Sequence, residues 1–178
     1  HMTPRASSSD LVRLVGSRDK QEIVIKGGHV GLVAGRGAQA AIIYDSPLAE
    51  KKTVITYDRL LTETQVLAGI LRDLGVTKGD RVILYMPMVP EAVVAMLACA
   101  RIGAIHSVVF GGFAAKELAT RIEDCKPKLI LSASCGIEPG RIVKYKPLLD
   151  EAIALSSYKP DSCLILQRPQ AEATLVAG

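Results

Sequence analysis

The chain has 178 residues, of which 49% are apolar and 22% are charged; this is ordinary globular composition and excludes a disordered, collagen-like or low-complexity chain. A formal net charge of +4 and an aromatic share of only 4% provide neither the basic tract nor the aromatic platform of a nucleic-acid-binding protein. We therefore expect one folded domain that does not bind nucleic acid.

The first 34 residues form an atypical N-terminal segment. His1-Met2 resembles a cloning scar, and the stretch Thr3 to Arg18 combines three consecutive serines with three arginines interrupted by Asp10. As a mitochondrial transit peptide this pattern is weak. We expect residues 1–34 to be a frayed end or a fusion, and residues 35–178 to form the folded part.

Two short strands open the folded part. Regular turn punctuation predicts two short strands, Ala41–Tyr44 and Thr53–Ile55, and the turn formers Asp45-Ser46-Pro47 between them favour an antiparallel pair. Leucines then recur at steps of three and four, which predicts an amphipathic helix from Thr56 to Gly75.

Strands and helices alternate in the rest of the chain. The apolar run Arg81–Met86 is short enough for a buried strand, and Pro90 followed by an acidic residue is typical of a helix start. That helix ends at Gly103 and is apolar on nearly all sides, as expected for a helix pressed against a sheet. The remaining predicted elements are strand Ala104–Phe110, helix Ala115–Asp124, strand Lys128–Ala133, loop Ser134–Arg141, helix Lys146–Ser156 and strand Ser162–Leu166.

This order predicts an α/β fold: a twisted parallel sheet with helices on both faces, preceded by the short antiparallel β pair. In a parallel sheet, every loop that leads from a strand to a helix leaves at the carboxyl edge. We therefore expect Met86–Pro90, Phe110–Phe113 and Ser134–Arg141 to cluster at one side, where a ligand would bind.

Two of these loops contain residue types that suit a phosphate. Gly111-Gly112 lets backbone amides approach a ligand near a helix N-terminus, although two glycines by themselves favour a plain tight turn without a ligand. Arg141 has the planar guanidinium that suits phosphate, although most such arginines are simply solvated.

Several other chemistries are excluded by pattern. Gly35 to Ala40 fits the dinucleotide fingerprint GxGxxA only formally, because it leads into a strand rather than a helix. The chain has no GxxxxGK phosphate loop, no GxSxG nucleophile elbow and no HExxH. Its four cysteines are too far apart for a CxxC zinc site, and His106 lies inside an apolar strand. We expect no metal site and no catalytic residue in this chain.

The longest unbroken apolar stretch, Ala92 to Ala100, is about half the ~20 residues that a membrane helix needs. No membrane segment and no secretory signal are predicted. We expect a cytoplasmic protein, with the mitochondrial matrix as the alternative.

Two long strings resemble one enzyme family, the AMP-forming short-chain acyl-CoA synthetases. The likeness covers roughly Gly35 to Gly178. Two further segments, Ala41 to Pro47 and Gly136 to Arg141, look more like the propionyl-CoA than the acetyl-CoA branch. The strings that carry the resemblance are GDRVILYMPMVPE, residues 79–91, and MLACARIGAIHSVVFGGF, residues 96–113.

The resemblance implies a reaction and part of a site. Such enzymes join a carboxylate to ATP, with Mg, and then transfer the acyl group from the adenylate to coenzyme A. Phe110, Gly111 and Gly112 match the family's FGG turn at the coenzyme A nucleotide, and Arg141 matches the second of two phosphate-side arginines; Glu138 stands in place of the first. The ATP loop, acyl pocket and catalytic lysine match no residue here, so the resemblance implies that the fragment alone is inactive.

Three alternatives remain open. The chain could be a non-catalytic module that binds coenzyme A or a nucleotide, or a structural piece that self-associates through a truncated sheet edge. Before Gly35 the chain departs from the family: Val15 to Lys20 and Gly27 to Leu32 are reminiscent of α/β-hydrolase-type polyester synthases. A hydrolase remnant around His29 is therefore the third alternative, although His29 lacks a predicted nucleophile partner.

Overall fold

The computed structural model of the protein describes residues 37–175. The predicted atypical segment 1–34 and His29 lie outside the described residues.

The first described elements are two antiparallel strands, β1 (Ala40–Ser46) and β2 (Lys51–Thr56), joined by the short 3₁₀-helix Pro47–Ala49. The side chain of Ser46 caps this turn by accepting a hydrogen bond from the Ala49 amide. The antiparallel pair is confirmed, and both strands are longer than predicted because pairing continues into polar residues such as Asp45 and Lys52.

Helix α2 (Tyr57–Asp73) follows directly, capped by the Thr56 side chain, which accepts from the Arg59 amide. Its inward face consists of Leu60, Thr64, Ala68 and Leu71. The predicted helix is confirmed, although not every leucine of the repeat is buried: Leu74 lies after the last helical residue and is exposed.

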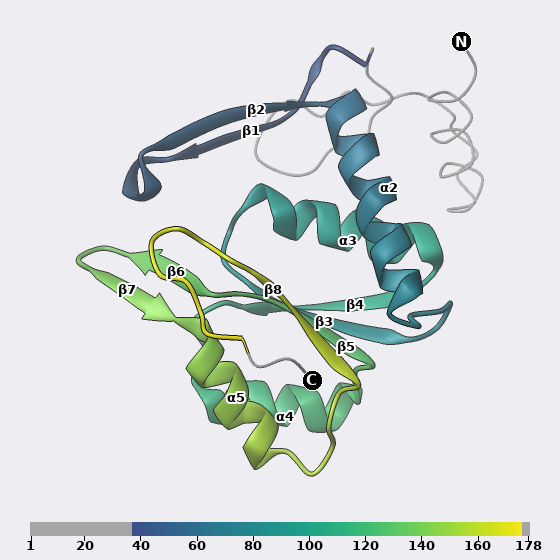
Figure 1. Cartoon of the computed structure of the whole chain (residues 1–178), viewed down its shortest axis with the longest axis vertical. Coiled ribbons are helices and arrows are strands. Elements are labelled where there is room, and N and C mark those ends of the chain that lie inside the picture. Colours follow the sequence, from purple (N-terminus) through teal and green to yellow (C-terminus); the bar gives the residue numbers. More distant parts are fainter. Residues whose placement is uncertain (1–36, 176–178) are drawn as a thin grey trace, which may run out of the picture.

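The centre of the molecule is a four-stranded parallel sheet in the order β4-β3-β5-β8 (Figure 1). Side chains of the inner strand β3 point alternately to the two faces of the sheet and so enter two different cores, as the two-residue repeat of a strand requires. Val82 and Leu84 contribute to one core, whereas Ile83 and Tyr85 contribute to the other. The strands are β3 (Arg81–Met86), β4 (Ile105–Phe110), β5 (Leu129–Ala133) and β8 (Ser162–Leu166).

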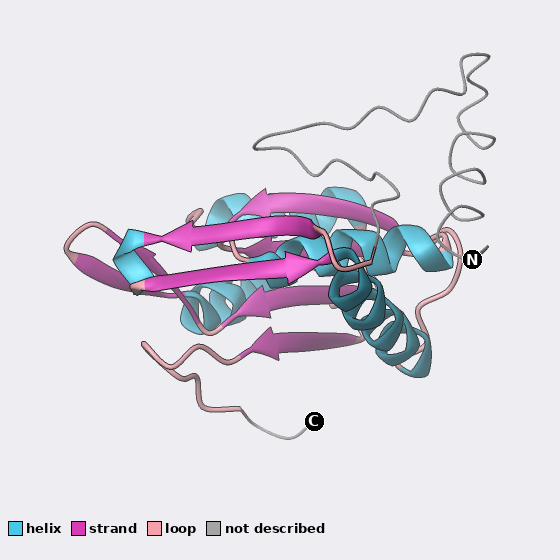
Figure 2. Ribbon diagram, turned by 90° about the horizontal axis from the view of Figure 1, so that it is seen from above, coloured by secondary structure: helices cyan, strands magenta, loops and turns pink. Residues whose placement is uncertain are grey.

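Helices cover both faces of this sheet. Helices α2 and α3 (Pro90–Ile102) lie on one face, and α4 (Ala115–Cys125) and α5 (Tyr145–Leu155) lie on the other (Figures 1 and 2). The α/β class is therefore confirmed. Helix α3 is apolar on most sides because it packs against α2 as well as against the sheet.

One predicted loop is wrong. Ser134–Arg141 was expected to be irregular, but the structure has a β-hairpin of β6 (Cys135–Glu138) and β7 (Arg141–Lys144) there, with Pro139-Gly140 as its turn. Gly140 has a φ of +77°, the conformation that the residue after proline adopts in a type II turn and that favours glycine there. The glycines and proline that suggested a loop are the turn residues of this hairpin.

Candidate functional site

A cavity of about 220 Å³ lies at the carboxyl edge of the parallel sheet. The turns after β3 and β4, the hairpin after β5 and the segment after β8 all contribute to its wall, and β1 closes it from the side. The expected clustering of the outgoing loops at one edge is therefore observed. The lining residues are Tyr44, Ser46, Pro87, Met88, Val89, Phe110, Gly111, Ile137, Glu138, Tyr145 and Arg168.

Tyr145, the first residue of α5, organises the floor of this cavity. Its phenol ring packs directly against two backbone segments: a Cβ added at Gly111 would lie 2.5 Å from Cε2, and one at Gly136 would lie 2.5 Å from Cζ. No side chain fits at those distances. The two glycines therefore let the turn after β4 and the strand β6 approach the same ring.

A second tyrosine holds the Phe110–Phe113 turn from below. The hydroxyl of Tyr85 donates to the Phe113 carbonyl at 2.8 Å and accepts from the Gly112 amide at 3.3 Å. Gly112 has a φ of +103°, which favours glycine. The Gly112 amide thus bonds to a protein group, and an incoming phosphate would have to compete for it.

Phe110, the last residue of β4, is 62% exposed at the cavity mouth. Its ring lies 5.8 Å from that of Phe113, at an interplanar angle of 58°. A large apolar ring held at the mouth of the cavity offers a surface on which a planar ligand group can stack.

Arg141 lies at the rim rather than in the wall. It is the register partner of Glu138 across the hairpin turn, and its Nε donates to the Glu138 carboxylate at 2.7 Å. The Arg141 side chain is 71% exposed, whereas Glu138 lines the cavity and its Oε1 lies 3.5 Å from the position of a Cβ on Gly112. Gly111, Gly112 and Arg141 thus come to one side of the molecule, with Glu138 between them.

Sequence reasoning missed Arg168, which is only 8% exposed and lines the cavity. Its Nη1 donates to the Cys135 carbonyl at 2.9 Å, and its amide donates to Ser134 Oγ at 2.9 Å. Among residues 37–175 no carboxylate pairs with it. A buried cation without a counter-ion is costly unless an anion arrives. The signal in the sequence was its position just after the strand ending at Leu166.

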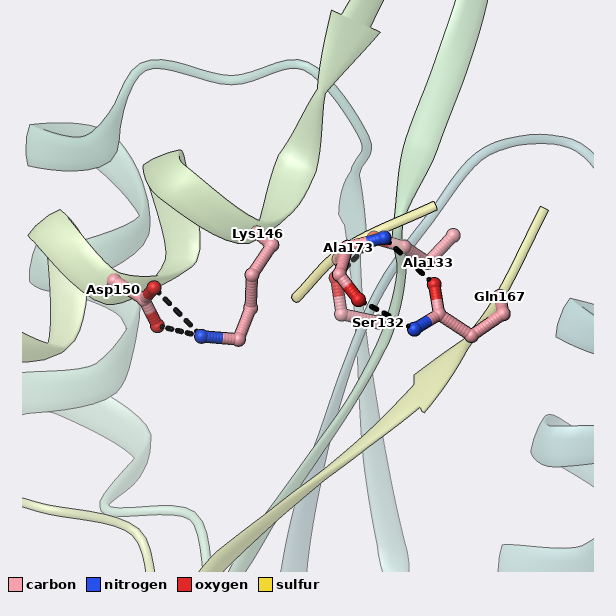
Figure 3. Close-up of polar contacts among 6 residues, drawn as sticks. All are labelled: Ser132, Ala133, Lys146, Asp150, Gln167 and Ala173. Carbon is pink, nitrogen blue, oxygen red and sulfur yellow. Dashed lines mark hydrogen bonds and ion pairs between the residues drawn. The ribbon is translucent and has the colours of Figure 1, made fainter. Parts of the chain in front are cut away.

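The segment around Arg168 is fixed by the side chain of its neighbour Gln167. The Gln167 side chain bonds to both backbone groups of Ala173, donating to its carbonyl at 2.7 Å and accepting from its amide at 2.9 Å (Figure 3). These two bonds close a short loop after β8 that positions the Arg168 guanidinium.

Figure 3 also shows the ion pair of Lys146 with Asp150 on α5, at 2.7 Å.

The Tyr145 hydroxyl is the second polar group that the sequence did not reveal. Burial, and then the neighbouring Tyr85 and Glu138, raise the pKa of Tyr145 to about 12, so the phenol stays protonated and can donate. Within residues 37–175 it makes no hydrogen bond, although its residue lines the cavity and is 3% exposed. Tyr145 and Arg168 thus place two hydrogen-bond donors at one cavity.

The described residues show little else that could react. They contain no group of three or more His, Cys, Asp or Glu side chains placed to hold a metal ion. Burial raises the pKa of the Cys99 thiol to about 11, which disfavours the thiolate. None of the helices in this part of the chain is long and apolar enough to cross a membrane.

Comparison with known proteins gives a consistent picture. A family model described as "AMP-binding enzyme" matches residues 33–175. An uncharacterised protein of Pseudomonas aeruginosa is 59% identical over 144 residues, 81% of this chain and 23% of that protein. A bovine protein named mitochondrial acyl-CoA synthetase short-chain family member 3 is 56% identical over 80% of this chain and 21% of its own length. The propionate–CoA ligase of Escherichia coli is 49% identical over 78% of this chain and 22% of its own length. The chain thus spans about a fifth of the length of these relatives.

Proposed function

The chain belongs to the family of AMP-binding enzymes, and we propose that residues 35–178 form part of the N-terminal domain of an AMP-forming short-chain acyl-CoA synthetase that prefers propionate or acetate. The names of the bovine and bacterial relatives support this activity. The whole enzyme would join the carboxylate to ATP, with Mg, and release pyrophosphate. The thiol of coenzyme A would then displace AMP from the acyl-adenylate.

The part played by the described residues is to hold the nucleotide end of coenzyme A. The observation that supports this is the buried, unpaired guanidinium of Arg168 beside the free donor of Tyr145. A cavity of about 220 Å³ is smaller than the ~300–1,000 Å³ of a typical ligand site. It would therefore take one phosphate-bearing portion of coenzyme A, with the rest outside.

Each residue has a stated task in this proposal. The planar fork of Arg168 donates to phosphate oxygens in the manner that suits guanidinium groups, and Tyr145 donates beside it. Phe110 offers its exposed ring to a planar group such as the adenine. Arg141, already paired to Glu138, contributes a weaker charge at the rim. The bond-making steps need groups outside these residues, so we propose that the chain alone does not turn over substrate.

The experiment is calorimetric titration of the 178-residue protein with coenzyme A. Arg168→Gln and Tyr145→Phe should weaken binding, and Arg168→Gln by about tenfold or more because a charge-assisted contact is lost. Arg141→Ala should have a smaller effect. The matched control is Arg121→Gln, an exposed arginine on α4. No heat with the unaltered protein, or equal affinity in Arg168→Gln, would reject the proposal.

A second candidate function is structural, as a self-associating module. Strand β4 is an edge of the parallel sheet, and it exposes Ile105, Val108 and Phe110. Exposed apolar edges favour strand pairing between molecules. Sedimentation at increasing protein concentration tests this candidate, because a sedimentation coefficient that stays at the monomer value would eliminate it.

For location we propose the cytoplasm, with the mitochondrial matrix as the alternative that the names of the bovine, rat and mouse relatives favour.

A further inference from the structure

A second, larger cavity lies at the opposite end of the sheet. It is a groove of about 680 Å³ between the carboxyl ends of α2 and α3 and the turn that leads into β3; these two helices lie side by side (Figure 1). We propose that this groove binds an anion with two or more phosphate groups. The proposal is independent of the coenzyme A site, because none of the lining residues is shared.

Three cationic side chains from three different elements line the groove. Arg72 comes from α2, Arg101 from α3 and Lys78 from the turn before β3, and no aspartate or glutamate is among the lining residues. Within the described part of the chain, none of the three forms an ion pair. Like charges gathered without a counter-ion favour the arrival of an anion.

The helix dipoles account for only part of this arrangement. Arg72 and Arg101 each lie in the last turn of a helix, where a cation complements the negative helix end. That reasoning does not explain Lys78, which lies outside both helices. Asp80 is not a lining residue, but its carboxylate accepts from the amide and hydroxyl of the groove residue Thr77. One neighbouring carboxylate beside three lining cations leaves an excess of positive charge.

Gly69 leaves the surface of the groove open beside these cations. It lies in the interior of α2, lines the groove, and a Cβ built on it would meet nothing within 4 Å. Packing therefore does not require glycine there, although glycine weakens a helix interior. A residue without a side chain leaves the helix backbone open between Gln65 and Arg72, where a ligand can approach closely.

The shape and chemistry of the groove fit a polyphosphate group. Its volume of about 680 Å³ falls within the ~300–1,000 Å³ typical of small-molecule sites. Cations on separate elements surround a chain of phosphates better than they match one carboxylate, and the buried Ala68 and Val76 form an apolar floor. The same phosphate chemistry occurs in inorganic pyrophosphate and in nucleoside triphosphates, so the test includes both.

The experiment is calorimetric titration of the 178-residue protein with pyrophosphate and, separately, with ATP, each without metal ions. The decisive variant is Gly69→Glu, which places a carboxylate in the groove one turn before Arg72 and uses a residue that favours helices. Its folding is confirmed by its melting temperature, and we expect its affinity for pyrophosphate to fall by about tenfold or more. Lys78→Gln should weaken binding in the same direction, and Arg121→Gln is the matched control.

Each outcome decides the question. Binding that is weakened by Gly69→Glu and Lys78→Gln but unchanged in Arg168→Gln supports the groove, and tighter binding of ATP than of pyrophosphate would identify a nucleotide as its ligand. Absence of binding, or binding unaffected by Gly69→Glu in a folded protein, overturns the proposal. Loss of pyrophosphate binding in Arg168→Gln alone also overturns it, since the anion would then occupy the other cavity.

Discussion

At the carboxyl edge of the central sheet the cavity is about 220 Å³ and its cation, Arg168, is buried, whereas at the amino edge the cavity is about 680 Å³ and its three cations are exposed. At the first edge, glycines are required because an aromatic ring occupies the space of their missing side chains. At the second edge, Gly69 faces open space. The same residue type thus serves close packing at one end and accessibility at the other.

The largest expected effect is at the carboxyl edge, where Gly136→Ala should destabilise the protein. Its Cβ would collide with the Tyr145 ring, and forcing extra volume into a packed site costs about 1–3 kcal/mol. Urea unfolding should therefore show a lower free energy of unfolding. The same substitution in a Tyr145→Leu background should cost less, and equal costs in both backgrounds would show that the ring contact is not the cause.

The next largest effect should come from Tyr85→Phe, which removes the hydroxyl beneath the Phe110–Phe113 turn. Two hydrogen bonds are lost, to the Phe113 carbonyl and the Gly112 amide, and we expect a loss of about 1–2 kcal/mol. Urea unfolding measures this loss, and Tyr158→Phe, a partly buried tyrosine elsewhere in the same core, is the control. A loss no larger than that of the control would mean that the turn holds its shape without Tyr85.

At the amino edge, replacing a glycine should raise the free energy of unfolding instead of lowering it. Gly69→Ala adds a methyl group where nothing lies within 4 Å, and alanine favours a helix interior over glycine by about 0.5–1 kcal/mol. The free energy of unfolding should therefore rise. A decrease would indicate that the groove is more crowded than the structure shows.

The smallest effect should be a pH-dependent one at Glu123, near the amino edge. Hydrogen bonds from the Ser157 amide and hydroxyl and from the Ser156 hydroxyl lower the pKa of this carboxyl below its ordinary value of 4.5. The charged form is thus favoured by folding, so its stabilisation is present above about pH 4.5 and is lost as the pH falls further.

Melting temperatures across this range measure that contribution. Glu123→Gln should melt below the unaltered protein at pH 7, and the difference should shrink on acidification to pH values below the ordinary pKa. Glu151→Gln, an exposed carboxyl on α5, is the control and should leave the melting curve unchanged at both pH values. A difference that does not depend on pH would remove the carboxylate as the cause.

The sequence predicted the framework well because periodicity reports which face of each element is buried. The strands Arg81–Met86 and Ser162–Leu166 have the predicted bounds, and α3 has the predicted start and the predicted Gly103 end. The hairpin β6–β7 was missed because its strands have only four residues each. Alternation over so short a span is indistinguishable from a loop rich in turn formers.

For the site, the sequence predicted the location, the carboxyl edge of the parallel sheet, but not most of the residues that line it. Strand order brought Gly111 and the Arg141 hairpin to one side, as expected. Tyr145 was missed because its role depends on contacts with Gly111 and Gly136 that only the fold creates. Arg168 was missed because its place after the strand ending at Leu166 does not by itself distinguish it from a solvated arginine. The basic groove was missed for the same reason, since Arg72, Lys78 and Arg101 meet only through the packing of α2 on α3.

The central claim is that the carboxyl edge holds the nucleotide end of coenzyme A through Arg168. The most direct test is an amide proton–nitrogen NMR titration of the protein with coenzyme A. The account predicts that the largest shifts fall on Gly111, Ile137 and Arg168. Shifts confined to Thr77, Lys78 and their neighbours at the amino edge, or no shifts at all, would contradict it.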